Sequence, residues 1–201
     1  MFDEKSLLRA VMSAEKGGIM MMFTGSGVYL VAENWMAQTT MDAVREHYRG
    51  LLGHLAEVLG YIPENEAVKI RKAKGMYDVQ PVLHEIAAAD IAFYGAHDNA
   101  WPLQHTGLHW RGALLQDQAK RIYRCALQGP HLTGGAYLTD NKRFMTWDPA
   151  MGEAVYEIAY RPEFEGPDRE RELWKHLESV WWAEWAEDTI DDWEQEEIDD
   201  E

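Results

Sequence analysis

Apolar residues near the start of the chain recur with two different periods, and each period predicts a different element. Spacings of three and four over residues 3–16 predict a helix that Asp3 caps at its start. Two apolar runs follow, over 19–24 and 28–31, and only the short glycine-rich turn 25–27 separates them. This arrangement predicts a β-hairpin.

A longer helical stripe comes next. Leucines, valines and a tyrosine recur three or four residues apart over 41–59, which predicts one helix with an apolar face. Thr39 or Thr40 is placed to cap its start, and Gly60 occupies the position where a left-handed glycine ends a helix. The segment 64–74 is basic at its end, and its pattern leaves helix and strand both open.

The middle of the chain mixes both periods. Helices are expected over 80–94 and 113–128, with a long ordered loop at 95–111 between them. A second hairpin is expected over 136–147, and a strand at 154–160 follows it. The whole pattern predicts a single α+β domain with two β-hairpins and about five helices, ending in an acidic, Trp-rich helix and tail.

The C-terminal pattern turns helical at Asp168, which is a plausible N-cap residue. On a helical wheel, five apolar residues share one face with Leu173: Trp174, Leu177, Val180, Trp181 and Trp185. Trp182 and Trp193 fall on the opposite side, so they face either a second layer of the protein or a partner. After Glu187 acids fall on every side of the wheel, which predicts a frayed, flexible tail.

Charge divides the chain more sharply than hydropathy does. The 201 residues hold 35 acids and 19 bases, a net charge of −16. From Pro162 onward there are 17 acids and 3 bases, net −14, which leaves −2 for the rest. The expected organisation is therefore a near-neutral body at 1–161, an amphipathic helix packed on it at 162–186, and an acidic tail at 187–201.

This charge distribution limits the classes of partner. A strongly negative field repels phosphate, so direct nucleic-acid binding and anionic membrane surfaces are disfavoured, whereas a basic protein surface is favoured. We therefore expect a non-enzymatic module that binds a basic protein through its acidic C-terminal region. The candidate partner-binding residues are Trp182, Glu187, Asp188, Asp191, Asp192, Trp193, Glu194, Glu196 and Glu197. A tail that serves only solubility is the alternative, although Trp193 and Ile198 are not needed for that role.

Nucleic-acid mimicry is one specific form of this hypothesis. Carboxylates in a row imitate phosphates and can occupy the groove of a nucleic-acid-binding protein. A small viral inhibitor of a host defence complex would use such a device. Mimicry needs ordered charges, however, and the tail pattern predicts flexibility.

Histidines suggest a second class of function. His97, His105 and His109 lie within the predicted loop, and Asp98 adjoins the first of them. Three imidazoles and a carboxylate are ligands that Zn²⁺ accepts, and a single histidine suffices as a general base. A small metal-dependent or acid–base enzyme is thus the alternative to a binding module. Hydrogen-bonded loop histidines explain the same residues without any metal, and no P-loop or Gly-x-Ser-x-Gly motif supports an enzyme.

Two further features bear on location. The first residues are charged and amphipathic, without the basic and apolar regions of a signal peptide, and Cys125 is the single cysteine. No apolar stretch reaches about 18 residues, the length that a membrane span requires. We expect a cytoplasmic protein with no cofactor unless the histidines bind zinc.

Overall fold

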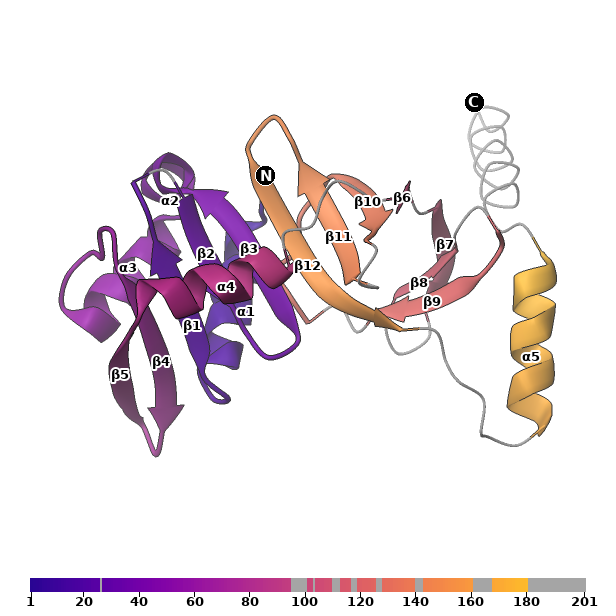
Figure 1. Ribbon diagram of the computed structural model, residues 1–201, viewed down its shortest axis with the longest axis horizontal. Coiled ribbons are helices and arrows are strands. Elements are labelled where there is room, and N and C mark those ends of the chain that lie inside the picture. The colour runs from indigo at the N-terminus through magenta and orange to yellow at the C-terminus, as the bar shows by residue number, and fades with distance from the viewer. Residues whose placement is uncertain are drawn as a thin grey trace, which may run out of the picture.

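Antiparallel strands and the helices that cover them make up the structure (Figure 1), a computed structural model. It describes residues 1–25, 27–94, 101–102, 104–109, 113–116, 119–125, 128–139, 143–160 and 168–180. The helices within these ranges are α1 (Glu4–Ala14), α2 (Met41–His47), α3 (Arg49–Leu59), α4 (His84–Tyr94) and α5 (Asp168–Ser179). The strands are β1 (Ile19–Phe23), β2 (Gly27–Val31), β3 (Trp35–Thr40), β4 (Ala67–Ala73), β5 (Met76–Val82), β6 (Trp101–Pro102), β7 (Gln104–His109), β8 (Ala113–Gln116), β9 (Ile122–Cys125), β10 (Gly135–Leu138), β11 (Arg143–Asp148) and β12 (Glu153–Tyr160).

One long strand, β12, joins the two parts of the sheet. The main path runs β5-β4-β1-β2-β3-β12-β11-β10-β6, and β7, β8 and β9 branch from it. The first half of β12 pairs with β3, where Ala154 lies opposite Gln38, and its end pairs with β9, where Tyr160 lies opposite Arg124. The continuous sheet and its helices form a single α+β domain, as the sequence pattern predicted.

Strand β1 is buried on both faces, which explains its unbroken apolar sequence. Met21 and its alternate neighbours pack with residues of α1, α2 and α3 on one face of the sheet. Met20 and Met22 pack with Ala87 of α4 on the other face. Figure 1 shows α4 lying across the sheet on the viewer's side. Burying a side chain of this size stabilises the fold by roughly 1.5–3 kcal/mol. A strand whose side chains are buried on both faces of the sheet therefore contributes strongly to the stability of the fold.

The first two predicted helix starts are confirmed, but the longest predicted helix is not continuous. Asp3 accepts a hydrogen bond from the Ser6 N–H at 2.7 Å, and Thr40 accepts one from the Ala43 N–H at 3.1 Å. The expected helix over 41–59 is two helices, because Tyr48 leaves helical geometry at φ −113° and ψ 54°. Its ring is buried and its hydroxyl donates to a buried carboxylate, a contact that sequence spacing cannot reveal. Gly60 ends α3 in the left-handed region, at φ 79°.

The predicted helix over 80–94 begins late. Residues up to Val82 belong to β5, and α4 starts only at His84. A helix over 80–94 would hold Pro81 in its first turn, but this residue lies in β5 opposite Val68. Because β5 ends the strand order, a proline there needs no N–H on its free side. The segment 64–74, whose pattern left helix and strand both open, contains strand β4.

Two predictions in the middle of the chain are wrong. The expected loop at 95–111 includes β6 and β7, and the expected helix at 113–128 is replaced by β8 and β9. These two strands pair with each other, and β9 also pairs with the end of β12. Leu115, Ile122 and their neighbours fit a helical spacing, but short apolar runs fit a strand equally well, and the long-range pairing with β12 decides between them.

The later elements follow the predicted pattern closely. The hairpin expected over 136–147 is β10 and β11, with Leu138 opposite Phe144, and the expected strand is β12. Asp168 was predicted as the N-cap of the C-terminal helix. It is instead the first residue of α5. In the part of the chain that the structure describes, no helix combines the length and the hydropathy that crossing a bilayer requires.

Candidate functional site

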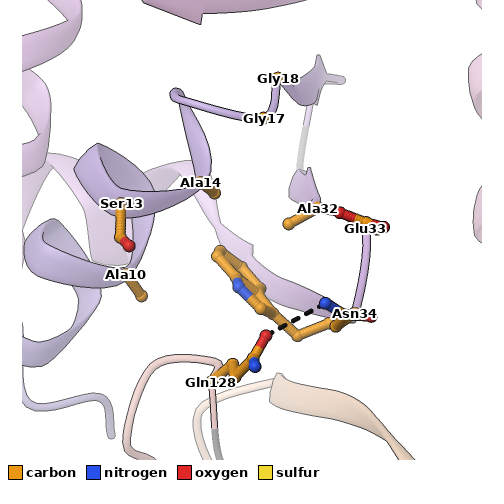
Figure 2. A pocket seen from close by; sticks show the side chains of 10 residues that line it. Ala10, Ser13, Ala14, Gly17, Gly18, Ala32, Glu33, Asn34 and Gln128 are labelled. Carbon is orange, nitrogen blue, oxygen red and sulfur yellow. Dashed lines mark hydrogen bonds between the residues drawn. The ribbon is translucent and has the colours of Figure 1, made fainter.

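A pocket of about 450 Å³ opens where the end of α1 meets the turn between β2 and β3. Figure 2 shows four sides: α1, the Gly17–Gly18 turn, the residues 32–34 and the side chain of Gln128. Its lining residues are Ala10, Ser13, Ala14, Gly17, Gly18, Ala32, Glu33, Asn34, Trp35 and Gln128. Half of these residues are alanine or glycine, and their small size leaves the space open.

Polar groups lie along one side of this pocket. The Asn34 side-chain N–H donates to the Gln128 side-chain oxygen at 3.1 Å, which ties the β2–β3 turn to the segment after β9 (Figure 2). Glu33 is exposed beside them, while Trp35 is only 3% exposed. The pocket therefore has a buried aromatic residue in its lining and amide and carboxylate groups at its edge.

A buried carboxylate, Glu153, connects several distant parts of the chain. One of its oxygens accepts hydrogen bonds from the hydroxyls of Tyr48 and Thr39, the latter at 2.9 Å. The other accepts from the Phe2 N–H at 3.0 Å and lies 3.6 Å from the Met1 amino group. Burial raises the pKa of Tyr48 far above its usual range, and the hydrogen bond to Glu153 adds to this shift. With both oxygens bonded and the group fully buried, the arrangement is structural.

A second buried carboxylate, Glu15, is bonded on one side only. Its Oε1 lies 2.6 Å from Nε2 of His54, which comes from α3. Its Oε2 is buried and has no hydrogen-bond partner among the described residues. The ring of Tyr77 lies edge-on to His54 at 6.1 Å, and Tyr77 accepts a hydrogen bond from the Lys72 ammonium at 2.9 Å. This hydrogen bond raises the pKa of Lys72.

This cluster has the residue types of an acid–base site but lacks access for a substrate. A carboxylate that orients a histidine is a common part of catalytic sites. However, neither Glu15 nor His54 lines the pocket, and their side chains are 0% and 9% exposed. Catalysis requires that the reacting groups touch the substrate. We therefore interpret the pair as part of the packing between α1, α3 and the sheet.

Helix α5 is attached to the β8–β9 hairpin at its C-terminal end. Trp174 and Leu177 are buried, and the Ile122 N–H donates to the Glu178 carboxylate at 3.2 Å. The buried side chain of Gln116 donates to the Val180 carbonyl at 2.9 Å. Leu173, which the helical wheel placed on the buried face, is 42% exposed. The anchored end of α5 is the point from which the most acidic part of the chain continues.

The residues predicted to bind a partner lie beyond this point. All nine are outside the described residues, so their role stays a prediction: Trp182, Glu187, Asp188, Asp191, Asp192, Trp193, Glu194, Glu196 and Glu197. The structure describes the base of the acidic region, residues 168–180, and nothing after it.

The predicted histidine site is also only partly described. His97 and Asp98 lie outside the described residues. His105 and His109 belong to β7 and not to a loop, and the pairing of β7 with β8 is irregular between them. Among the described side chains, no group of three or more metal-ligating residues could hold an ion. Zinc binding by these four residues remains a prediction that metal analysis of the purified protein would test.

The sequence-based predictions did not include the buried carboxylates Glu153, Glu157 and Glu15. Glu153 and Glu157 alternate with Val155 along β12, and all three are buried. Side chains two residues apart on a strand point to the same face of the sheet, so acids that share a face with a valine indicate a buried carboxylate. Glu15 and His54 are 39 residues apart, and no spacing rule connects them.

Comparison with known proteins adds no relative from which a function could be transferred. No family model, curated protein or solved structure matches the chain.

Proposed function

We propose that this protein is a non-enzymatic binding or inhibitory module that engages a basic protein through its acidic C-terminal region. The observation that carries the proposal is the charge asymmetry of the chain: net −14 from Pro162 onward against −2 before it. Opposite charges accelerate encounter and select partners, so a charge block of this size favours a basic surface.

The attachment of α5 supports the proposal. Trp174 and Leu177 bury the helix against the domain, and the Gln116 side chain bonds the Val180 carbonyl at its end. The acidic segment therefore continues from a fixed base. A segment held at one end stays close to a partner that the domain also contacts, which raises its effective concentration there.

The apolar residues within the acidic segment support binding over a purely solubilising role. Trp193 and Ile198 stand among ten acids in the last fifteen residues. Tryptophan is enriched among the residues that dominate interface energy. In the narrower form of the proposal the partner is a nucleic-acid-binding protein, such as a component of a host defence complex. The acids would then occupy a site made for phosphates.

Charge neutralisation in the full-length chain tests the proposal. One variant replaces every Asp and Glu of residues 187–201 with Asn or Gln and keeps Trp193 and Ile198. We expect it to bind a fluorescent oligo-arginine peptide at least about tenfold more weakly than the wild type at low salt, because the attraction is between exposed charges. The wild type should lose the peptide as salt rises. Trp193→Ala should weaken binding without changing its salt dependence.

Two further measurements complete the experiment. A chain truncated after Ala186 should behave like the neutralised variant, while its thermal unfolding remains that of the wild type. Proteins retained from a lysate by the immobilised wild type, but not by the neutralised chain, are the candidate natural partners, and competition with a DNA duplex identifies nucleic-acid-binding ones. Equal binding and equal salt dependence in the wild type and the neutralised chain would refute the proposal.

A further inference from the structure

The pocket at the end of α1 has an electronegative lining. It meets the C-terminal end of the helix, where Ser13 and Ala14 line it. Helix carbonyls and the helix dipole place partial negative charge at this end, and α1 has no basic residue in its last turn to offset it. This partial charge favours a cation, but its effect is weakened because the Ala14 carbonyl already accepts hydrogen bonds from the Gly17 and Gly18 N–H groups and because Lys16 follows the helix.

Two acids strengthen this preference. Glu33 lies in the lining and is exposed, so its carboxylate can turn toward a ligand. Glu157 is not in the lining, but it is buried on β12 opposite Trp35, and its Oε1 accepts a hydrogen bond from the Gly129 N–H. Lys69 passes beside Gly18 but is not among the residues that line the space. No lining residue is a lysine or an arginine.

The hydrogen-bonding groups favour a donor-rich ligand. The Asn34 amide N–H already donates to Gln128, which leaves the Asn34 side-chain oxygen as an acceptor next to Glu33. A guanidinium group is planar, carries only donors and forms paired hydrogen bonds with a carboxylate. The volume of about 450 Å³ lies within the range of small-molecule pockets and can receive the end of a long side chain.

We infer that this pocket binds a guanidinium group, and that in the complex it receives an arginine side chain of the basic partner. The inference rests on the proposed function for the identity of the partner, but the pocket is chemically independent of the acidic tail. It gives the partner a second contact on the folded domain, and this contact selects arginine by geometry, whereas the tail selects positive charge in general.

Titration of the full-length chain with blocked arginine (N-acetyl-arginine N-methylamide) tests the inference. The readout is the indole N–H resonance of Trp35 in a ¹H–¹⁵N spectrum, because this ring belongs to the lining. We expect a saturable shift with blocked arginine. Blocked citrulline has the same shape without the charge, so it should bind about tenfold more weakly or not at all.

Two substitutions locate the binding. Glu33→Gln should weaken blocked arginine about two- to fivefold, because an exposed ion pair contributes little more than that. Glu46→Gln, which removes an exposed acid outside the pocket, is the matched control and should change nothing. Gly17→Met should abolish the shift by filling the space, whereas Gly17→Ala should keep it, since an added Cβ meets only the Ala14 carbonyl at 3.7 Å.

The chain neutralised over residues 187–201 separates this inference from the proposed function. Here blocked arginine should shift Trp35 as in the wild type, although the oligo-arginine peptide binds more weakly. If blocked arginine moves no lining resonance while the peptide still binds the wild type, the pocket inference is overturned and the tail proposal stands. If blocked arginine and blocked citrulline bind equally, or Glu33→Gln has no effect, recognition of the guanidinium is also overturned.

Discussion

Two of the buried carboxylates, Glu153 and Glu15, occupy similar environments but differ in how completely they are bonded. Both side chains are 0% exposed. Glu153 accepts hydrogen bonds on both oxygens, from Tyr48, Thr39 and Phe2. Glu15 has His54 on one oxygen and no described partner on the other.

This difference predicts that the two carboxylates contribute unequally to the stability of the fold. A buried charge is costly unless hydrogen bonds replace its hydration, and a fully bonded carboxylate makes its donors depend on it. Glu153 joins β12 to β3, to the break between α2 and α3, and to the segment before α1. Glu15 caps the C-terminal end of α1, where the helix dipole disfavours a negative charge. The same substitution at both positions should therefore have very different costs.

Glu153→Met should have the largest effect. Methionine fills nearly the same volume but accepts no strong hydrogen bond, so the Tyr48 and Thr39 hydroxyls lose their acceptor in the interior, while the Phe2 N–H keeps only the Tyr48 hydroxyl oxygen at 3.0 Å. Leaving such donors unpaired costs about 1–3 kcal/mol each, and we expect a total loss of about 3–5 kcal/mol in the free energy of unfolding. Urea denaturation of the wild type and the variant measures it. A loss below about 1 kcal/mol would show that the network is not structural.

Tyr48→Phe should cost less, about 1 kcal/mol, because it leaves no buried partner unpaired. Thr39 still bonds one Glu153 oxygen, and the Phe2 N–H still bonds the other. The variant also has a pH signature. The pKa of Tyr48 is raised in the folded protein, so the unfolded chain releases this proton first, near pH 10.

The sign of the pH effect follows from linkage. A group with a raised folded pKa stabilises the fold fully below its unfolded pKa, and this contribution is lost as pH rises above it. The wild type should therefore lose stability more steeply than Tyr48→Phe from about pH 10 upward. Tyr61, whose pKa is also raised, is present in both proteins and cancels in the comparison. Parallel curves in this range would contradict the assignment to Tyr48.

The fold could be predicted where local signals decided it. Asp3 and Thr40 mark helix starts by direct side-chain bonds to the following turn, and the run Ile19–Phe23 forms one doubly buried strand. The prediction failed where a distant contact decides the structure. Strand β9 pairs with the end of β12 and β8 pairs with β9, and the break at Tyr48 depends on Glu153, which lies 105 residues away.

The candidate sites were less predictable than the fold. The acidic C-terminal region can be found in the sequence alone, because the number of charged residues does not depend on the fold. The pocket is not visible, because Ala14, Gly17 and Ala32 matter there only by being small. Glu33 and Gln128 come to the same space only after β3, β12 and β9 have paired. The shape of the pocket depends on the long-range pairing of these strands, which the local sequence pattern does not predict.

Glu15→Met should have the smallest effect and tests the comparison most directly. The substitution removes one bond to His54, but it also removes an unpaired buried oxygen and a negative charge at the end of α1. The His54 side chain is 9% exposed, so its ring nitrogen can form a hydrogen bond with water instead. We expect a change of no more than about 1 kcal/mol, in either direction, in the same urea experiment. A loss as large as that of Glu153→Met would mean that the second oxygen of Glu15 is bonded in solution, for example by a buried water, and the two carboxylates would then be equivalent.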